Sequence, residues 1–236
     1  MRGHDYVSQI AEEGYALVES VIDHVQVERL RQAFTDAEAV AAPRRSGAAL
    51  FAVRRALDIP AIRAEAEAGA AFHLSADVLG TDAKPVRAIL FDKNPDANWK
   101  VAWHQDQTIA VKERREVEGF GPWSVKGGGV HVQPPAAVLE QMVTVRLHLD
   151  PCPAENGALR VLPGTHTRGK LTPTSLSATA QDVEPVTCAV GLGGAVLMRP
   201  LTVHGSSPSE VAQHRRVVHI EYAAGTLPGA LTWAAA

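Results

Sequence analysis

The sequence predicts a mainly β protein with a jelly-roll (double-stranded β-helix) core and flanking α-helices. Short runs rich in Val, Ile and Leu follow one another after residue 85. Gly, Pro and Asn separate these runs, whereas helical periodicity is confined to the residues before 85. Many short strands with turn residues between them are typical of β-sandwiches and barrels, so the strands form the core and the helices pack outside it.

The first third of the chain is predicted to be mostly helical. A short strand is expected within residues 14–18, before the first long helix. Asp23 and Gln26 have the spacing of a capping box, and apolar residues then repeat at helical spacing. Residues 36–45 are expected to be loop or weak helix. A second helix is expected from Asp58-Ile59-Pro60, where Asp58 is an N-cap candidate, to Leu79-Gly80.

The remaining residues are expected to form the strands of the core. Residues 112–135 are charged and then glycine-rich, with Pro134-Pro135 at the end, and predict a long excursion that acts as a lid or binding loop. The strand-like runs are Val86–Phe91, Thr108–Val111, Met142–Leu149, Ala158–Leu162, Ala195–Arg199 and Val217–Tyr222.

Length and composition favour one domain over residues 1–236, with a helix-rich part at 1–84 and the jelly-roll core at 85–223. The chain has 236 residues, of which 46% are hydrophobic, and a net charge of -3 without a strongly one-signed region. A nucleic-acid partner is therefore not expected, and a small-molecule substrate is. Two cysteines, no apolar run of membrane-spanning length and no signal-peptide pattern predict a cytoplasmic protein without a membrane partner. No oligomeric state is indicated.

A His-x-Asp pair, His104 and Asp106, is the first candidate for a metal site. Residues two apart on a strand project to the same face, so both side chains can reach one point inside a barrel. His204 follows an apolar run and is the best candidate for a third ligand from a distant strand. Two histidines and one carboxylate form the facial triad that holds Fe(II) and leaves positions open for oxygen chemistry.

Two further pairs have the same ligand chemistry and are not excluded by spacing. His148-Leu149-Asp150 is a second His-x-Asp, and His219-Ile220-Glu221 is a His-x-Glu. Asp150 precedes a proline and is more naturally a turn residue, and His219 follows Arg215 on what is expected to be one continuous strand. Arg215 and Ser206 are expected on neighbouring antiparallel strands beside the metal. A guanidinium and a hydroxyl there suit a dicarboxylate, because arginine binds a carboxylate through two parallel hydrogen bonds.

These motifs resemble the phytanoyl-CoA dioxygenase (PhyH) family of Fe(II)- and 2-oxoglutarate-dependent oxygenases. The resemblance rests on Trp103-His104-Gln105-Asp106, on the block from Asn156 to His166, and on His204-Gly205-Ser206 followed by Arg215. It implies that His104, Asp106 and His204 bind Fe(II), and that Arg215 and Ser206 bind the distal carboxylate of 2-oxoglutarate. The implied reaction uses O2 to hydroxylate, or otherwise oxidise, a small organic molecule, with release of succinate and CO2.

Other residues near these motifs are weaker candidates. The family tends to place an aromatic residue near the cosubstrate, which makes Trp123 a candidate, although a tryptophan also anchors a lid equally well. Gln105 and Lys93 are candidate substrate residues; Gln105 alternates away from His104, and Lys93 either pairs with an anion or is solvated. His166 is expected to be a structural hydrogen bonder. The alternative function is a cupin-like metal-binding protein or non-oxidative metalloenzyme with the same triad, for which neither Arg215 nor Ser206 would be needed.

Overall fold

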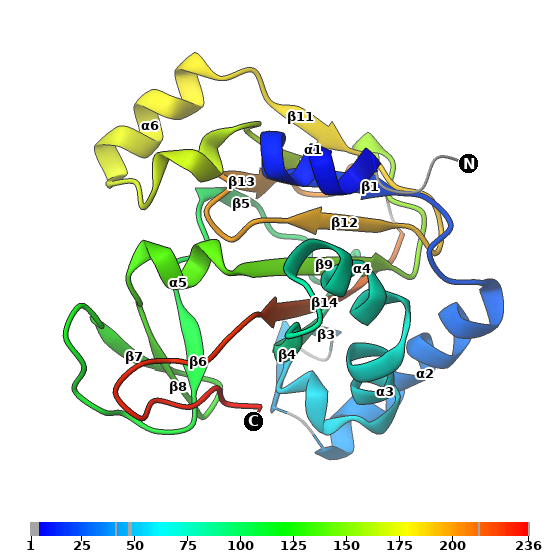
Figure 1. Cartoon of the computed structure of the whole chain (residues 1–236). Helices are drawn as coiled ribbons and strands as arrows, with labels where there is room; N and C mark the ends of the chain where they lie inside the picture. Colours follow the sequence, from blue (N-terminus) through cyan, green and yellow to red (C-terminus); the bar gives the residue numbers. More distant parts are fainter. Residues whose placement is uncertain (1–4, 41, 47–48, 212, 236) are drawn as a thin grey trace.

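The computed structural model describes residues 5–40, 42–46, 49–211 and 213–235. Strands from both ends of the chain form a seven-stranded sheet in the order β1-β12-β9-β14-β4-β3-β2, in which every neighbouring pair is antiparallel (Figure 1). Its strands are β1 (Tyr15–Val18), β2 (Ala42–Ser46), β3 (Ala49–Arg54), β4 (Lys84–Lys93), β9 (Met142–His148), β12 (Ala195–Met198) and β14 (Arg215–Ala223).

Two smaller antiparallel sheets complete the β structure. The four-stranded sheet has the order β11-β10-β13-β5, and a three-stranded sheet has the order β6-β8-β7. Side chains from both the seven-stranded and the four-stranded sheet line one cavity, as expected for the inside of a jelly roll. The strands are β5 (Val101–His104), β6 (Ile109–Val111), β7 (Trp123–Lys126), β8 (Gly129–Val132), β10 (Leu159–Val161), β11 (Val186–Cys188) and β13 (His204–Ser206).

Helices from the first third of the chain cover one face of the seven-stranded sheet (Figure 1). None of the helices in the described part of the chain is long and apolar enough to span a membrane. The helices are α1 (Asp5–Glu13), α2 (His24–Val40), α3 (Pro60–Ala68), α4 (Ala70–Leu79), α5 (Ala136–Glu140) and α6 (Pro173–Asp182), with short 3-10 turns at Ala56–Asp58, Ala154–Asn156 and Thr165–Arg168.

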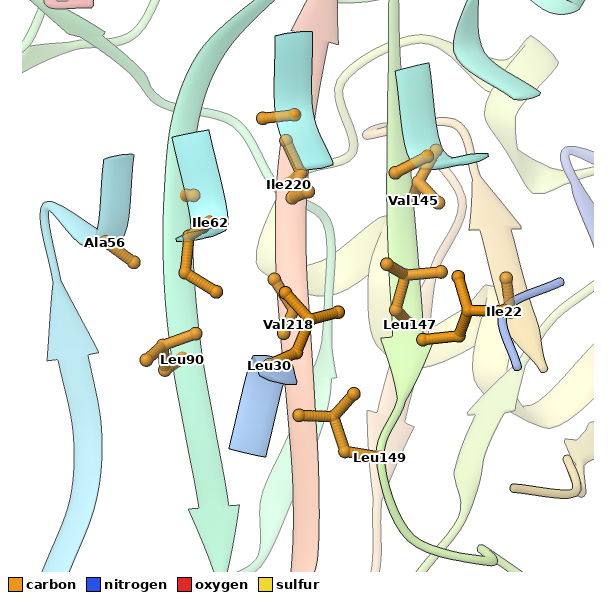
Figure 2. Close-up of a cluster of buried hydrophobic side chains, with 14 of the residues drawn as sticks. Ile22, Leu30, Ala56, Ile62, Leu90, Val145, Leu147, Leu149, Val218 and Ile220 are labelled. Carbon is orange, nitrogen blue, oxygen red and sulfur yellow. The ribbon is translucent and has the colours of Figure 1, made fainter. Parts of the chain in front are cut away.

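The main hydrophobic core lies between these helices and the seven-stranded sheet. Figure 2 shows Leu30 and Ile62 from the helices facing Leu90, Val145 and Val218 from the central strands, and all five are buried. The period-2 alternation of a strand explains this division, since successive side chains point to opposite faces. The same alternation turns the other side chains of the central strands toward the inside of the jelly roll.

The predicted capping box at the start of α2 is confirmed. The Asp23 amide donates to Gln26 Oε1 at 3.0 Å, and the Gln26 amide donates to Asp23 Oδ1 at 2.8 Å. These two bonds satisfy backbone donors that have no partner inside the helix. The helix runs on to Val40, which agrees with the helical alternative predicted for residues 36–45, whereas residues 42–46 form strand β2, so the prediction of loop or weak helix is wrong for the second half of that stretch.

The single helix predicted up to Leu79 is two helices, α3 and α4, which meet at Gly69. The buried Glu65 carboxylate accepts a hydrogen bond from the Ala71 amide at 2.9 Å and so caps the start of α4. A Cβ at position 69 would lie 2.2 Å from Glu65 Oε2. Glycine therefore leaves the space that lets this carboxylate satisfy the amides of the second helix.

Two stretches without a strand prediction form strands. Residues 42–46 and 49–54 pair as β2 and β3, and the excursion at 112–135 contains the hairpin β7–β8, which pairs with β6. The excursion is thus ordered by strand pairing and is not a purely irregular insertion. Both stretches become strands because they pair with other segments of the chain. Local sequence patterns carry little information about such pairing.

Candidate functional site

Two side chains from paired strands of the four-stranded sheet, and a third from the loop after β5, form the candidate metal centre; Asp106 is the loop residue and not a strand residue as predicted. His104 ends β5, and its register partner across the sheet is His204, which begins β13. His204 Nε2 lies 3.6 Å from Asp106 Oδ2, and His104 Nε2 lies 3.9 Å from Asp106 Oδ1. One ligand atom from each of the three residues lies within 4.8 Å of the others, and no other such group of three occurs among the described residues.

Backbone carbonyl groups orient both imidazole rings. Nδ1 of His104 lies 2.9 Å from the Ala102 oxygen, and Nδ1 of His204 lies 2.9 Å from the Thr202 oxygen. A carbonyl only accepts, so each Nδ1 carries the proton and each Nε2 presents its lone pair toward Asp106. This outer-shell hydrogen bond is the usual way in which proteins fix the tautomer of a metal-binding histidine.

The protonation states suit a cation. Burial lowers the pKa of His204 to about 4, so its ring is neutral at neutral pH. Burial alone would raise the pKa of Asp106, but the surrounding positive charges, His204 foremost, lower it to about 2. A neutral imidazole and an ionised carboxylate are the forms that bind a metal.

In the two alternative pairs, His148 with Asp150 and His219 with Glu221, the carboxylates bind arginine side chains. Asp150 accepts hydrogen bonds from the guanidinium groups of Arg31 and Arg216, at 2.7 Å each. His219 and Glu221 do share a face, with 3.3 Å between His219 Nε2 and Glu221 Oε1, but Glu221 is also ion-paired with Arg87.

A cavity of about 310 Å³, here called the metal cavity, extends from the triad into the barrel. Ser206 and Arg215 line it together with His104, Asp106 and His204. Arg215 begins β14 and is 6% exposed, and one of its guanidinium nitrogens donates to the Gly157 carbonyl. Its Nε is buried without a partner, which leaves a donor for a ligand in this cavity.

Lys93 lies next to Arg215 because the two residues are register partners on β4 and β14. Lys93 is fully buried, and its Nζ lies 2.8 Å from the Ser207 carbonyl oxygen and 3.4 Å from Ser206 Oγ. Burial, and then the positive charge of Arg215, lower the pKa of Lys93 to about 7. In the described part of the chain neither cation is paired with a carboxylate, so this end of the cavity suits an anion.

Two largely buried arginines beside the pair His219 and Glu221, Arg87 and Arg146, were not identified from the sequence. Arg146 lies 2.8 Å from Nδ1 of His219, and Arg87 pairs with Glu221, which bonds His219 in turn. All except Glu221 line the metal cavity. A signal for them existed: Arg87 and Arg146 are charged residues at alternate positions of otherwise apolar strands, where a purely structural barrel would have apolar side chains.

Three other predicted residues lie away from the metal cavity. The Gln105 side chain is buried and bonds the backbone of Gly169, Leu171 and Leu201, so it ties together the loops behind the triad. Trp123 begins β7 and packs on the apolar cluster of the three-stranded sheet, the position of a lid anchor. His166 Nε2 lies 3.2 Å from the Ala11 carbonyl oxygen, a structural contact as predicted.

Several solved structures similar to this chain are described as α-ketoglutarate-dependent enzymes or contain 2-oxoglutarate. The α-ketoglutarate-dependent epimerase SnoN of nogalamycin biosynthesis is 20% identical, with a TM-score of 0.69 over 95% of this chain and 89% of that chain. The carbocyclase SnoK of the same biosynthesis is 16% identical, with a TM-score of 0.72 over 95% and 85%. EctD from S. alaskensis, crystallised with 2-oxoglutarate and 5-hydroxyectoine, is 17% identical, with a TM-score of 0.69 over 92% and 74%. These similarities confirm the predicted jelly-roll fold.

Sequence comparison identifies the family. No curated protein sequence matches the chain. The family described as Phytanoyl-CoA dioxygenase (PhyH) matches residues 10–217, which contain every motif of the predicted resemblance. The resemblance and the enzyme class predicted from it, an oxygenase-type enzyme dependent on iron and 2-oxoglutarate, are thereby confirmed. The chain belongs to the phytanoyl-CoA dioxygenase (PhyH) family.

Proposed function

We propose that this chain is a non-haem Fe(II)- and 2-oxoglutarate-dependent dioxygenase that hydroxylates, or otherwise oxidises, a small organic molecule. The observation that carries the proposal is the meeting of a His-Asp-His group and an unpaired buried arginine in one cavity. A metal-binding protein without oxygenase activity would need the first group and would have no use for the second.

His104, Asp106 and His204 would hold the iron. Their donor set of two imidazoles and one carboxylate is the one that suits Fe(II) with open coordination positions, and the Nδ1 contacts already hold both rings in the ligating tautomer. When bound there, Fe(II) with 2-oxoglutarate and O2 supplies oxidation of a C–H bond, coupled to conversion of 2-oxoglutarate into succinate and CO2.

Arg215 and Ser206 would bind the distal carboxylate of 2-oxoglutarate. The unpartnered Nε of Arg215 is a buried donor, and a carboxylate satisfies it better than any neutral group. Because Lys93 Nζ lies near Ser206 Oγ, the serine oxygen can accept from the lysine while its own proton points to the ligand. Lys93 would thus bind the cosubstrate indirectly, whereas the sequence had suggested substrate contact.

The test uses protein prepared without oxygen. Fe(II) and 2-oxoglutarate should together give a visible charge-transfer absorption band in the wild type. Asp106→Ala should lose tight iron binding. Arg215→Ala should keep its iron and weaken 2-oxoglutarate binding by about 30-fold or more, since removing one partner of a buried charged pair costs about 2–5 kcal/mol.

Arg216→Ala is the matched control for Arg215→Ala. Arg216 is the next residue on β14, and its guanidinium pairs with Asp150 outside the metal cavity. The control should bind 2-oxoglutarate as the wild type does. If the wild type binds iron but gives no band with 2-oxoglutarate and forms no succinate, the chain is a cupin-like metal protein and the oxygenase proposal is wrong.

A further inference from the structure

A second cavity of about 460 Å³, here called the side cavity, adjoins the metal cavity. The β4 strand, the β7–β8 hairpin and the turn after β3 contribute to its walls. Four residues line both cavities: Arg54, Arg87, Ile89 and Lys126. The side cavity is therefore placed to hold the part of a substrate that does not reach the iron.

The charged side chains that line the side cavity are strongly one-signed. The single lining carboxylate is Asp58, which lies 2.8 Å from the Arg55 guanidinium. Arg63 pairs with Glu67, and Arg87 pairs with Glu221. Neither of these carboxylates lines the side cavity. The lining cations are Arg54, Arg55, Arg63, Arg87, Lys112 and Lys126.

Lys126 is one of three cations, with Arg54 and Arg87, at the junction with the metal cavity. Its Nζ lies 3.3 Å from Oγ1 of Thr108, which lines the metal cavity two residues after Asp106. No carboxylate among the described residues pairs with it. Burial, and then the positive charges of Arg87 and Arg54, lower the pKa of the Lys126 ammonium group. An anion at the junction would relieve this repulsion between three cations.

His131, on the wall formed by β8, adds a second unsatisfied group. It is 4% exposed, and its Nδ1 lies 3.0 Å from the Gly129 oxygen, so Nδ1 is the proton donor. Burial lowers the pKa of His131, which leaves the ring neutral at neutral pH. Its Nε2 is then a buried acceptor without a partner in the described chain, and it suits a hydroxyl or N–H group of a ligand.

We propose that the substrate is a small organic acid or phosphate whose anionic group binds Lys126 and Arg87 at the junction of the two cavities. The carbon to be oxidised then lies in the metal cavity, and a polar group with an O–H or N–H reaches His131. This inference rests on the proposed function, since it assumes that the metal cavity is occupied by iron and 2-oxoglutarate. It adds the charge of the substrate and the residues that select it.

The test uses inorganic phosphate as the probe and Mn(II) in place of Fe(II), so that no turnover occurs. Saturating 2-oxoglutarate blocks the anion site at Arg215. The 31P relaxation rate of phosphate reports binding close to the paramagnetic ion. The wild type should enhance relaxation strongly. Lys126→Gln should weaken phosphate binding about tenfold or more, because a charge-assisted hydrogen bond contributes about 1.5–3 kcal/mol. Lys126→Arg should retain it.

Lys100→Gln is the matched control, because Lys100 is exposed and lines neither cavity. It should bind phosphate as the wild type does. Competition with acetate separates the two kinds of acid: displacement at similar concentrations indicates a carboxylate site, and resistance indicates a phosphate site. If phosphate enhancement is absent, or unchanged by Lys126→Gln, the inference is wrong. A normal 2-oxoglutarate band in the same samples would then leave the proposed function intact.

Discussion

Binding of 2-oxoglutarate should depend on pH through Lys93. The buried ammonium group has a pKa of about 7, lowered first by burial and then by the charge of Arg215, with Arg146 also acting in this direction and Cys152 opposing it. A carboxylate bound to Arg215 and Ser206 places a negative charge near Lys93, which favours the charged lysine and raises this pKa again. Above pH 7 the lysine must therefore take up a proton when the cosubstrate binds.

The size of the effect follows from the Lys93 pKa of about 7. Below pH 7 the lysine is already charged, so the affinity for 2-oxoglutarate should be constant there. Above pH 7 the dissociation constant should rise by a factor of 1 + 10^(pH - 7), about 2-fold at pH 7 and about 11-fold at pH 8 relative to the plateau, by proton linkage. At pH 8 about 0.9 proton should be taken up for each molecule bound.

Titration calorimetry without oxygen measures both quantities. The dissociation constant is followed from pH 6 to pH 8.5, and the proton uptake is obtained from buffers with different ionisation enthalpies. Lys93→Met keeps the length of the side chain and removes the charge, so its affinity should be weaker at pH 6 and nearly constant over this range. All other titratable groups are present in both proteins, so the difference between them isolates Lys93. A wild type with constant affinity, or a variant with the full pH dependence, would refute the reasoning.

Two substitutions outside the metal site should destabilise the fold. Asp150→Ala should lower the free energy of unfolding by about 2–4 kcal/mol, because it leaves the guanidinium groups of Arg31 and Arg216 without their carboxylate, yet it should keep full iron content. Leu147→Ala should lower it by about 2–5 kcal/mol, since Leu147 is fully buried between the sheet and the helices. Urea unfolding and metal analysis check both, and loss of iron in a folded Asp150→Ala protein would move the metal site to the second His-x-Asp pair.

The triad could be predicted because its geometry is partly local. The spacing of His104 and Asp106 places both side chains near one point, and the order of His204, Ser206 and Arg215 matches the family motif. The structure adds that His104 and His204 are register partners, which no spacing in the sequence states. The structure was also needed to choose among the three candidate pairs. Asp150 and Glu221 are each bound to an arginine, whereas Asp106 faces the two histidines.

The side cavity could not have been predicted from the sequence. Lys126 and His131 lie on a hairpin whose sequence, rich in Gly and charged residues, indicated an irregular excursion. They line the side cavity, next to the metal cavity, because β8 pairs with β6, which follows Asp106 closely in the sequence. Long-range pairing of this kind depends on packing between distant segments, and local propensity carries little information about it.

Charge balance links the two proposals. Five cationic side chains line the metal cavity, Arg54, Arg87, Lys126, Arg146 and Arg215, whereas Asp106 is the only lining carboxylate among the described residues. Fe(II) and the two carboxylates of 2-oxoglutarate carry opposite charges of equal size, so binding both leaves this excess in place. Glu221 offsets part of it behind Arg87. An excess of positive charge around a cavity raises the free energy of the empty site, and a bound anion lowers it. A neutral substrate would leave the junction uncompensated, and an acidic one completes it.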